Sequence, residues 1–263
     1  MKQLSAEVLS NEQLLPPFAH AGGRATLGSR LIWLRCPEIA AGARPGQFVM
    51  VRCGEELTLP RPFSIHQVSR EGIAIFYAVW ADGKGTPWLA ERKEKDSVAV
   101  FGPLGNGFEI PPEGENLLLV AGGTGIAPLC FLAQEAVKQK RRVTLLLGAR
   151  TEAQLYPPSL VPDGIKLVTT TDDGKGMVTQ LLPDFTGGAD AVFSCGPLAM
   201  YRTMAQMPEL KEKPAQVSLE IMMGCGIGVC YGCTVRTTSG LKQACKDGPI
   251  FNLNEVLWTE LRE

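Results

Sequence analysis

The chain has neither a long apolar run nor an excess of charge of one sign. Its 263 residues include 26 Lys and Arg against 27 Asp and Glu, which gives a formal net charge of −1. This balance gives no indication of binding to nucleic acid or to an anionic membrane surface. No run of about eighteen apolar residues occurs, and no apolar segment follows a basic start. We therefore expect no transmembrane helix and no signal peptide, and we predict a cytoplasmic protein.

Histidine is scarce, and cysteine is unevenly placed. The two histidines, His20 and His66, leave little material for a His-based zinc site or a nucleophilic site. Eight cysteines are too few for a disulfide scaffold in a chain of this length, and four of them lie near one end. In a reducing compartment such a group suggests a metal centre. Three others lie in or beside apolar runs and are expected to be small core residues: Cys36, Cys53 and Cys130.

The hydrophobic pattern changes twice along the chain and predicts a multidomain α+β protein. Residues 1–105 contain short apolar runs between Gly and Pro turns, which is typical of a small antiparallel barrel or sandwich. Residues 116–215 alternate continuous apolar strands with helical segments, which indicates a parallel sheet covered on both faces. One helix is expected from about 128 to 140, and a short one at 87–94. Residues 216–263 form a glycine-rich third unit.

The third unit carries four cysteines with a distinctive spacing. In the sequence CGIGVCYGC, followed by a distant fourth cysteine, the gaps are four, two and eleven residues. Plant-type [2Fe–2S] ferredoxins use this spacing, whereas zinc ribbons usually begin with a C-x2-C pair. Intervening glycines let backbone N–H groups turn towards the cluster sulfurs. A zinc site or unligated buried cysteines are the alternatives. The predicted ligands are Cys225, Cys230, Cys233 and Cys245.

Two glycine turns end strands of the predicted parallel sheet. The first follows the strand 117–121 and leads into a helix, where N–H donors and the helix dipole favour a pyrophosphate. It lacks the G-x-G-x-x-G fingerprint, because Pro128 stands near the third glycine position. Taken alone, it is equally an ordinary βα turn. The second, 195–197, lies at the same edge of the sheet, where ligands of α/β folds bind.

Two segments of the β region also suggest ligand contacts. The stretch LPRPFSI, residues 59–65, has prolines that predict an edge strand or a ligand-facing segment. Arg61 could pair with a phosphate there, and Ser64 could donate to a flavin or to a second phosphate. A solvated loop arginine is the alternative. DGKGT, residues 82–86, could be a phosphate-binding turn at a helix start or a plain tight turn.

In this order, the motifs RPFS, GT, GGTGIAP and CGP resemble the ferredoxin–NADP⁺ reductase superfamily. That superfamily pairs an FAD-binding β-barrel with an NAD(P)-binding α/β domain. The C-terminal stretches SLEIMMGCGIGVCYGC and ACKDGPIF, together with FGPLGNGF and TTDDGKG, narrow the resemblance. They resemble the family of electron-transfer subunits of NAD-linked dihydroorotate dehydrogenase, over nearly the whole chain.

The resemblance implies a fold and a set of cofactor contacts. It predicts an N-terminal antiparallel FAD-binding β-barrel (1–108), an α/β parallel-sheet NAD-binding domain (109–215) and a small C-terminal [2Fe–2S] domain (216–263). The residues implied to bind FAD are Arg61, Pro62, Phe63, Ser64, Ala78, Val79, Trp80, Gly85 and Thr86. Those implied to bind NAD are Gly122, Gly123, Thr124 and Gly125 at the pyrophosphate, and Cys195, Gly196 and Pro197 at the nicotinamide. The four clustered cysteines would ligate the [2Fe–2S] centre, and Glu220 would lie near the flavin.

The implied function is an electron relay in pyrimidine (UMP) biosynthesis. Electrons would pass from an FMN-containing dihydroorotate dehydrogenase subunit through the cluster and FAD to NAD⁺, in a heterotetramer of two plus two. The chain itself would hold no dihydroorotate site and no catalytic residue. The alternative is a flavin and iron–sulfur NAD(P)H-oxidoreductase subunit of a hydrogenase or of a bifurcating NADH–ferredoxin:NADP reductase. A zinc-binding interaction module is a more distant alternative.

Three segments remain open at this point. The Gly- and Pro-rich stretch 16–30 leaves the first strands of the barrel uncertain. Arg150 and Thr151 could meet the 2′-phosphate of NADP, or could instead stack on adenine or form a salt bridge, and the family favours NAD. The stretch TTDDGKGMV is shorter than the loop usual in the family, and we assign it no contact.

Overall fold

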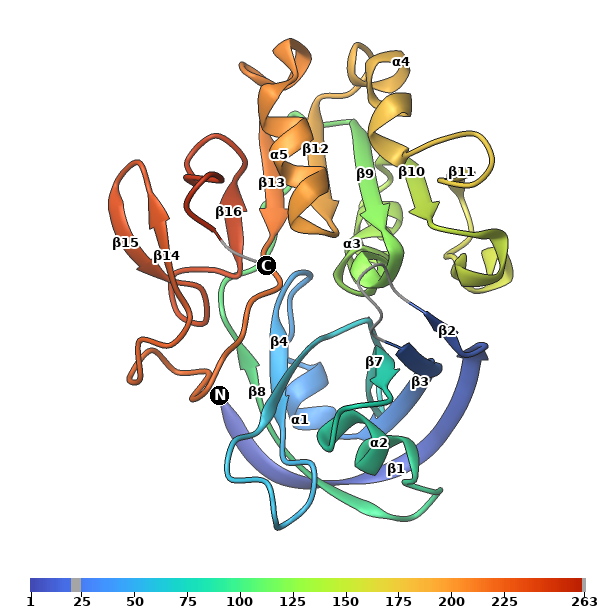
Figure 1. Ribbon diagram of the computed structural model, residues 1–263, viewed down its shortest axis with the longest axis vertical. Helices are drawn as coiled ribbons and strands as arrows, with labels where there is room; N and C mark the ends of the chain where they lie inside the picture. The colour runs from blue at the N-terminus through green and yellow to red at the C-terminus, as the bar shows by residue number, and fades with distance from the viewer. Residues whose placement is uncertain (20–24, 262–263) are drawn as a thin grey trace.

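A computed structural model describes residues 1–19 and 25–261, and its first part is an antiparallel sheet curled around a core (Figure 1). The strand order is β5-β4-β8-β1-β3-β7-β6, with β2 paired to β3. Two short helices accompany it, α1 (Pro37–Ala40) and α2 (Gly85–Ala90). The strands are β1 (Lys2–Leu15), β2 (Phe18–Ala19), β3 (Ala25–Arg35), β4 (Phe48–Val51), β5 (Arg61–Ser64), β6 (Gln67–Val68), β7 (Gly72–Trp80) and β8 (Ser97–Leu104).

Buried and exposed residues alternate in strands that have one face in the core and the other in water. In β8, Val98 and Val100 are buried while Ser97 and Ala99 face water. Strand β7 differs, because its residues 72–77 are all buried. One face of β7 lines the core of the barrel, and the other face meets helix α3 (Ile126–Lys138) and the turn before it, where Phe76 joins a different apolar cluster.

The second sheet is mostly parallel and has the order β11-β10-β9-β12-β13-β16. Residues of β9 alternate between its two faces. Leu117 and Leu119 pack with helix α3, while Leu118 and Val120 pack with α4 and α5. This two-sided burial is the reason for the continuous apolar runs. The elements are β9 (Asn116–Gly122), α3 (Ile126–Lys138), β10 (Arg142–Ala149), β11 (Ile165–Thr171), α4 (Leu182–Thr186), β12 (Ala191–Cys195) and α5 (Leu198–Gln206).

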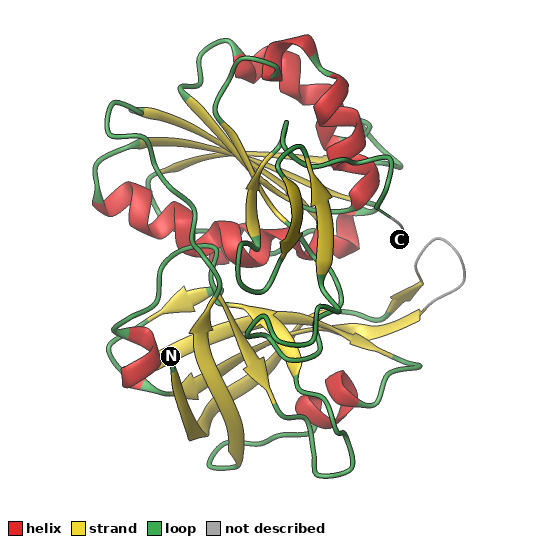
Figure 2. Cartoon of the chain, turned by 90° about the vertical axis from the view of Figure 1, so that its left-hand side faces the viewer, coloured by secondary structure: helices red, strands yellow, loops and turns green. Residues whose placement is uncertain are grey.

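The C-terminal residues are divided between a hairpin and the second sheet. Strands β14 (Thr234–Thr237) and β15 (Gly240–Gln243) form the hairpin, while β13 (Ala215–Ser218) and β16 (Ile250–Asn252) extend the parallel sheet. Figure 2 shows this unit beside both larger parts. Five short 3₁₀ turns complete the described elements: η1 (Gly123–Gly125), η2 (Glu152–Gln154), η3 (Pro158–Leu160), η4 (Val178–Leu181) and η5 (Pro208–Leu210).

The expected elements agree with the structure in kind and differ at their ends. Helix α3 begins at Ile126, two residues before the predicted start, because the glycine turn leads directly into it. Helix α2 spans Gly85–Ala90 rather than 87–94. In the described part of the chain, none of the helices has the length and apolar character needed to cross a membrane. The boundaries at 108/109 and 215/216 stay predictions, and β13 lies across the second one.

Candidate functional site

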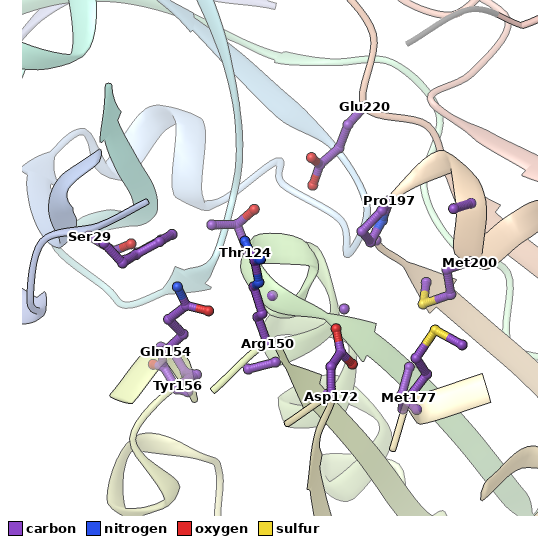
Figure 3. Close-up of a pocket in the computed structure, with 18 of the residues that line it drawn as sticks. Ser29, Thr124, Arg150, Gln154, Tyr156, Asp172, Met177, Pro197, Met200 and Glu220 are labelled. Carbon is purple, nitrogen blue, oxygen red and sulfur yellow. The ribbon is translucent and has the colours of Figure 1, made fainter. Parts of the chain in front are cut away.

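A cleft of about 520 Å³ lies between the curled sheet and the parallel sheet (Figure 3). Strands β9, β10, β11 and β12 bring their carboxyl ends to one wall, and β3 and β7 form the other. This second wall also includes Leu15 at the end of β1 and, from the Gly- and Pro-rich stretch 16–30, Phe18 and Ser29. A cleft at the carboxyl edge of a parallel sheet is where nucleotides bind in α/β folds. His20, which belongs to the same sequence stretch, falls outside the described residues.

The two glycine turns predicted from the sequence meet at the floor of the cleft. Gly122 and Gly123 line it together with Gly196 and Pro197. A Cβ atom on Gly122 would lie 2.8 Å from the Pro197 side chain. At Gly125 a Cβ atom would overlap the carbonyl group of Cys195. Glycine is therefore required for helix α3 to start so close to the end of β12.

A thiol, a carboxyl group and a phenol surround the second turn. The Sγ atom of buried Cys195 lies 3.4 Å from Glu220 Oε1, and burial, followed by the charge of Glu220, raises the pKa of this thiol well above its usual range. Cys195 therefore stays protonated and donates to the carboxyl group. Tyr201 Oη accepts from the Gly196 N–H at 2.8 Å and donates to the Ser218 carbonyl at 2.7 Å, which fixes the turn against β13. Glu220 is accessible to water in the open cleft. The protein atoms packed around its carboxyl group still reduce the hydration of the charged form, and this desolvation raises its pKa.

The predicted FAD residues form a second group, on the barrel. Strand β5, which contains the RPFS motif, is an end strand of its sheet, as its prolines predict. Arg61 lies against the start of α2, because a Cβ atom on Gly85 would be 3.3 Å from Arg61 Cγ. Thr86 Oγ1 accepts from the Trp80 N–H at 3.0 Å, and Trp80 also lines the cleft. Trp80 thus joins this group to the cleft.

The cysteine loop directs backbone donors at its own sulfur atoms. The Gly228 N–H lies 3.1 Å from Cys245 Sγ, and the Val229 N–H lies 3.4 Å from Cys225 Sγ. Gly226 and Gly228 have φ values of +73° and +82°, which favour glycine. Donors aimed at thiolates stabilise the negative charge of an iron–sulfur centre. The donor set therefore fits the predicted cluster.

The four cysteines lie as two pairs. Cys230 lies beside Cys225, and Cys233 lies beside Cys245, whose N–H donates to Cys233 Sγ at 3.4 Å. Among the described residues, no three His, Cys, Asp or Glu side chains gather as ligands of a single ion. Two neighbouring pairs of cysteines are compatible with the predicted dinuclear cluster.

The cysteine loop packs directly on the barrel. A Cβ atom on Gly226 would lie 2.6 Å from Met50 Cγ and 3.3 Å from Leu104 Cδ1. Met50 belongs to β4 and pairs with Pro62 of β5, so the loop covers the strand next to the RPFS motif.

Several residues that line the cleft had no signal in the sequence. Gln154, Tyr156 and Asp172 are among them, and the segment of Asp172 was assigned no contact. Asp172 directly follows β11, and its N–H bonds to the carbonyl of Ala149 at the end of β10, which brings it beside Arg150. The position of Asp172 in the cleft depends on the parallel register of β10 and β11, and the local sequence does not contain this register.

Comparison with known proteins gives first the class of protein. The protein-family model described as "Oxidoreductase NAD-binding domain" matches residues 119–161. A second family model, "Iron-sulfur cluster binding domain of dihydroorotate dehydrogenase B", matches residues 220–257. The solved structure titled as an NADH-dependent reduced ferredoxin-NADP oxidoreductase is 32% identical, with a TM-score of 0.83 over 97% of this chain and 91% of that one. Ferredoxin-NADP⁺ reductase from Plasmodium falciparum shares the fold alone, at 13% identity and a TM-score of 0.63 over 83% of this chain and 96% of that one. The chain is thus an oxidoreductase of the ferredoxin–NADP⁺ reductase type with an iron–sulfur domain.

Curated relatives narrow this class to one family. The electron transfer subunit of dihydroorotate dehydrogenase B (NAD(+)) from Desulforamulus reducens is 40% identical over 236 residues, which are 84% of this chain and 90% of that relative. The same subunit from Caldanaerobacter subterraneus is 40% identical over 81% of this chain and 87% of its own length. The chain belongs to the family of electron transfer subunits of dihydroorotate dehydrogenase B.

Family membership bears on the predictions made from the sequence. The predicted fold class is confirmed, and so is an NAD-dependent oxidoreductase that acts as an electron-transfer subunit with [2Fe–2S], FAD and NAD as cofactors. An electron-transfer subunit implies a catalytic partner subunit. The assignment of individual residues to each cofactor stays a prediction.

Proposed function

We propose that this chain carries electrons between a dihydroorotate-oxidising partner and NAD⁺ in pyrimidine biosynthesis. When bound, FAD exchanges a hydride with NAD and single electrons with the [2Fe–2S] cluster, and the protein supplies their placement. The observation that carries the proposal is the packing of Gly226 in the cysteine loop on Met50, one strand from the RPFS motif. This packing supports a short path from the cluster to the flavin.

The cleft is the proposed NAD site. Gly122, Gly123, Thr124 and Gly125 bring backbone N–H groups and the start of α3 to a pyrophosphate. Cys195, Gly196 and Pro197, held by Tyr201, would lie beside the nicotinamide. On the barrel, Arg61 and Thr86 would meet the FAD pyrophosphate. The remaining proposed FAD contacts are Pro62, Phe63, Ser64, Ala78, Val79, Trp80 and Gly85.

Asp172 supports NAD rather than NADP as the nucleotide. Its carboxylate lines the cleft at the end of β11, on the same wall as Arg150. A carboxylate there accepts a hydrogen bond from a ribose 2′-hydroxyl and repels a 2′-phosphate. Arg150 alone would favour the phosphate, so the acidic neighbour decides the preference.

The surface over the cysteine loop is the proposed docking site of the partner subunit. Cys230 is exposed, and apolar side chains gather around it along the chain: Met222 is 90% exposed, Tyr231 71% and Val229 66%. Large apolar side chains so close to a redox centre favour a protein partner. An FMN-containing catalytic subunit in a two-plus-two heterotetramer is the proposed occupant, because the relatives are named as electron-transfer subunits.

The test uses the chain coexpressed with a dihydroorotate dehydrogenase catalytic subunit. The complex is expected to reduce NAD⁺ with dihydroorotate, and Cys230→Ser is expected to abolish this activity while NADH still reduces the flavin. Cys36→Ser is the matched control, because this buried cysteine lies in the core of the barrel. Dihydroorotate-dependent reduction of NAD⁺ by the isolated chain, or by the Cys230→Ser complex at the normal rate, would refute the relay.

A further inference from the structure

One buried histidine connects the curled sheet to the part of the chain that contains the parallel sheet. His66 is 0% exposed and lies two residues after β5, the strand that carries the RPFS motif. Its Nδ1 atom is 3.0 Å from the carbonyl oxygen of Ala127, and its Nε2 atom is 2.9 Å from Tyr156 Oη. Both partners belong to the part of the chain that contains the parallel sheet.

The hydrogen bonds define the tautomer of His66. A carbonyl oxygen only accepts, so Nδ1 carries the hydrogen and donates it to Ala127. Nε2 of the neutral ring is then an acceptor, and the Tyr156 hydroxyl donates to it. Burial lowers the pKa of His66 to about 4, although the bond to Ala127 acts in the opposite direction. The ring is therefore neutral at physiological pH, as this pair of bonds requires.

Each partner of His66 belongs to the nucleotide side of the cleft. Ala127 is in the first turn of α3, directly after the glycine turn proposed to hold the NAD pyrophosphate. Tyr156 lines the cleft beside Gln154 (Figure 3), and its ring packs edge-on against Phe76 of β7 at 5.1 Å. Gln67, which follows His66 in the chain, donates from its side-chain Nε2 to Cys130 Sγ of α3 at 3.4 Å. The segment after the RPFS strand is thus hydrogen-bonded both to helix α3 and to Tyr156 in the cleft.

We propose that His66 is a positioning residue for hydride transfer. By bonding Ala127 and Tyr156 it sets the distance between the flavin strand and the nucleotide wall. This inference rests on the proposed function, because it requires NADH to bind in the cleft. Hydride transfer needs its reacting atoms close together, and a misplacement of about 1 Å costs up to about 100-fold in rate. A buried donor or acceptor that loses its partner has no water to replace it, so the two walls shift when either bond is removed.

The test measures anaerobic reduction of bound flavin by NADH in rapid-mixing experiments on the full chain with its cofactors. Tyr156→Phe removes one hydroxyl group and keeps the ring. Tyr77→Phe is its control, because that buried hydroxyl bonds to Asn11 on the barrel side of β7. His66→Asn keeps an amide near the Nδ1 position, and His66→Gln reaches the Nε2 position.

We expect Tyr156→Phe and His66→Asn to lower the limiting rate of flavin reduction per bound flavin by about tenfold. We expect His66→Gln to recover part of that loss, and Tyr77→Phe to match the wild type. Electron transfer from flavin to cluster is expected to keep its rate in every variant, because the cysteine loop packs at Met50, on a different part of the barrel.

Two results would overturn the role of His66. One is a wild-type limiting rate in Tyr156→Phe and His66→Asn. The other is an equal loss of both electron-transfer steps, which would indicate a general disturbance of folding. Failure of the wild-type chain to reduce its flavin with NADH is a different result, and it would refute the proposed function itself.

Discussion

Adding a methyl group at Gly125 tests the close approach of helix α3 to strand β12. A Cβ atom there would lie 2.0 Å from the carbonyl oxygen of Cys195 and 2.8 Å from the nitrogen of Gly196. Both are backbone atoms, so no side-chain rotation can relieve the overlap. Ordinary contact begins at 3.4 Å, and the helix start and the strand end would have to separate by roughly 1.4 Å.

The expected cost of Gly125→Ala comes from this overlap alone. The φ of Gly125 is −60°, a value that alanine adopts without strain. Overpacking of this kind destabilises by about 1–3 kcal/mol. Gly187→Ala is the matched control, because Gly187 has a φ of −57° and nothing within 4 Å of an added Cβ atom. We expect that control to be neutral or stabilising by up to about 1 kcal/mol.

The assay is denaturant unfolding of both variants, followed by circular dichroism, with NADH saturation of flavin reduction measured in parallel. Gly125→Ala is expected to unfold at lower denaturant than Gly187→Ala and to need more NADH for half-saturation. Equal unfolding midpoints and equal saturation in the two variants would refute the reasoning, because the two glycine turns would then not need to touch.

Three further predictions concern the cluster, the nucleotide and pH. Gly226 and Gly240 both have a positive φ, so substitution of either by Ala costs about 1–2 kcal/mol in backbone strain. Only at Gly226 would the added Cβ atom also meet Met50. We therefore expect rapid-mixing experiments to show slower electron transfer from flavin to cluster in Gly226→Ala and not in Gly240→Ala. Asp172→Ser is expected to raise the ratio of NADPH to NADH activity at least roughly tenfold, whereas Asp173→Ser, which does not line the cleft, should leave steady-state kinetics unchanged. The pKa of His66 is about 4 in the folded protein and about 6.5 in the unfolded chain. The stability that the neutral ring provides is therefore fully present above pH 6.5. It is lost as the pH falls towards 4, by up to roughly 3 kcal/mol. Unfolding at pH 7 and pH 5 should therefore differ more in wild type than in His66→Gln.

The local motifs could be predicted from the sequence because each depends on neighbouring residues. The spacing of Cys225, Cys230 and Cys233 predicted a cluster loop, and the structure aims N–H groups at its sulfur atoms. The prolines around Arg61 predicted an edge strand, and β5 is one. Continuous apolar runs that alternate with helical segments predicted the parallel sheet.

Features that depend on distant parts of the chain could not be predicted in this way. His66 and Tyr156 are 90 residues apart, and scarcity of histidine had argued only against a metal or nucleophilic site. Asp172 enters the cleft because β11 lies beside β10 in parallel register. Strand β16 returns to the sheet of β13, although the hydrophobic pattern assigned it to a separate unit.

The measurement that tests the central claim most directly is an anaerobic NADH titration of the purified chain, followed by visible absorption and low-temperature EPR. The account predicts that flavin bands and cluster absorption bleach together and that the rhombic signal of a reduced [2Fe–2S] centre appears. The contradicting result is a flavin that NADH reduces in a protein with stoichiometric zinc and no such signal. Cys225, Cys230, Cys233 and Cys245 would then hold zinc, and the electron relay would not exist.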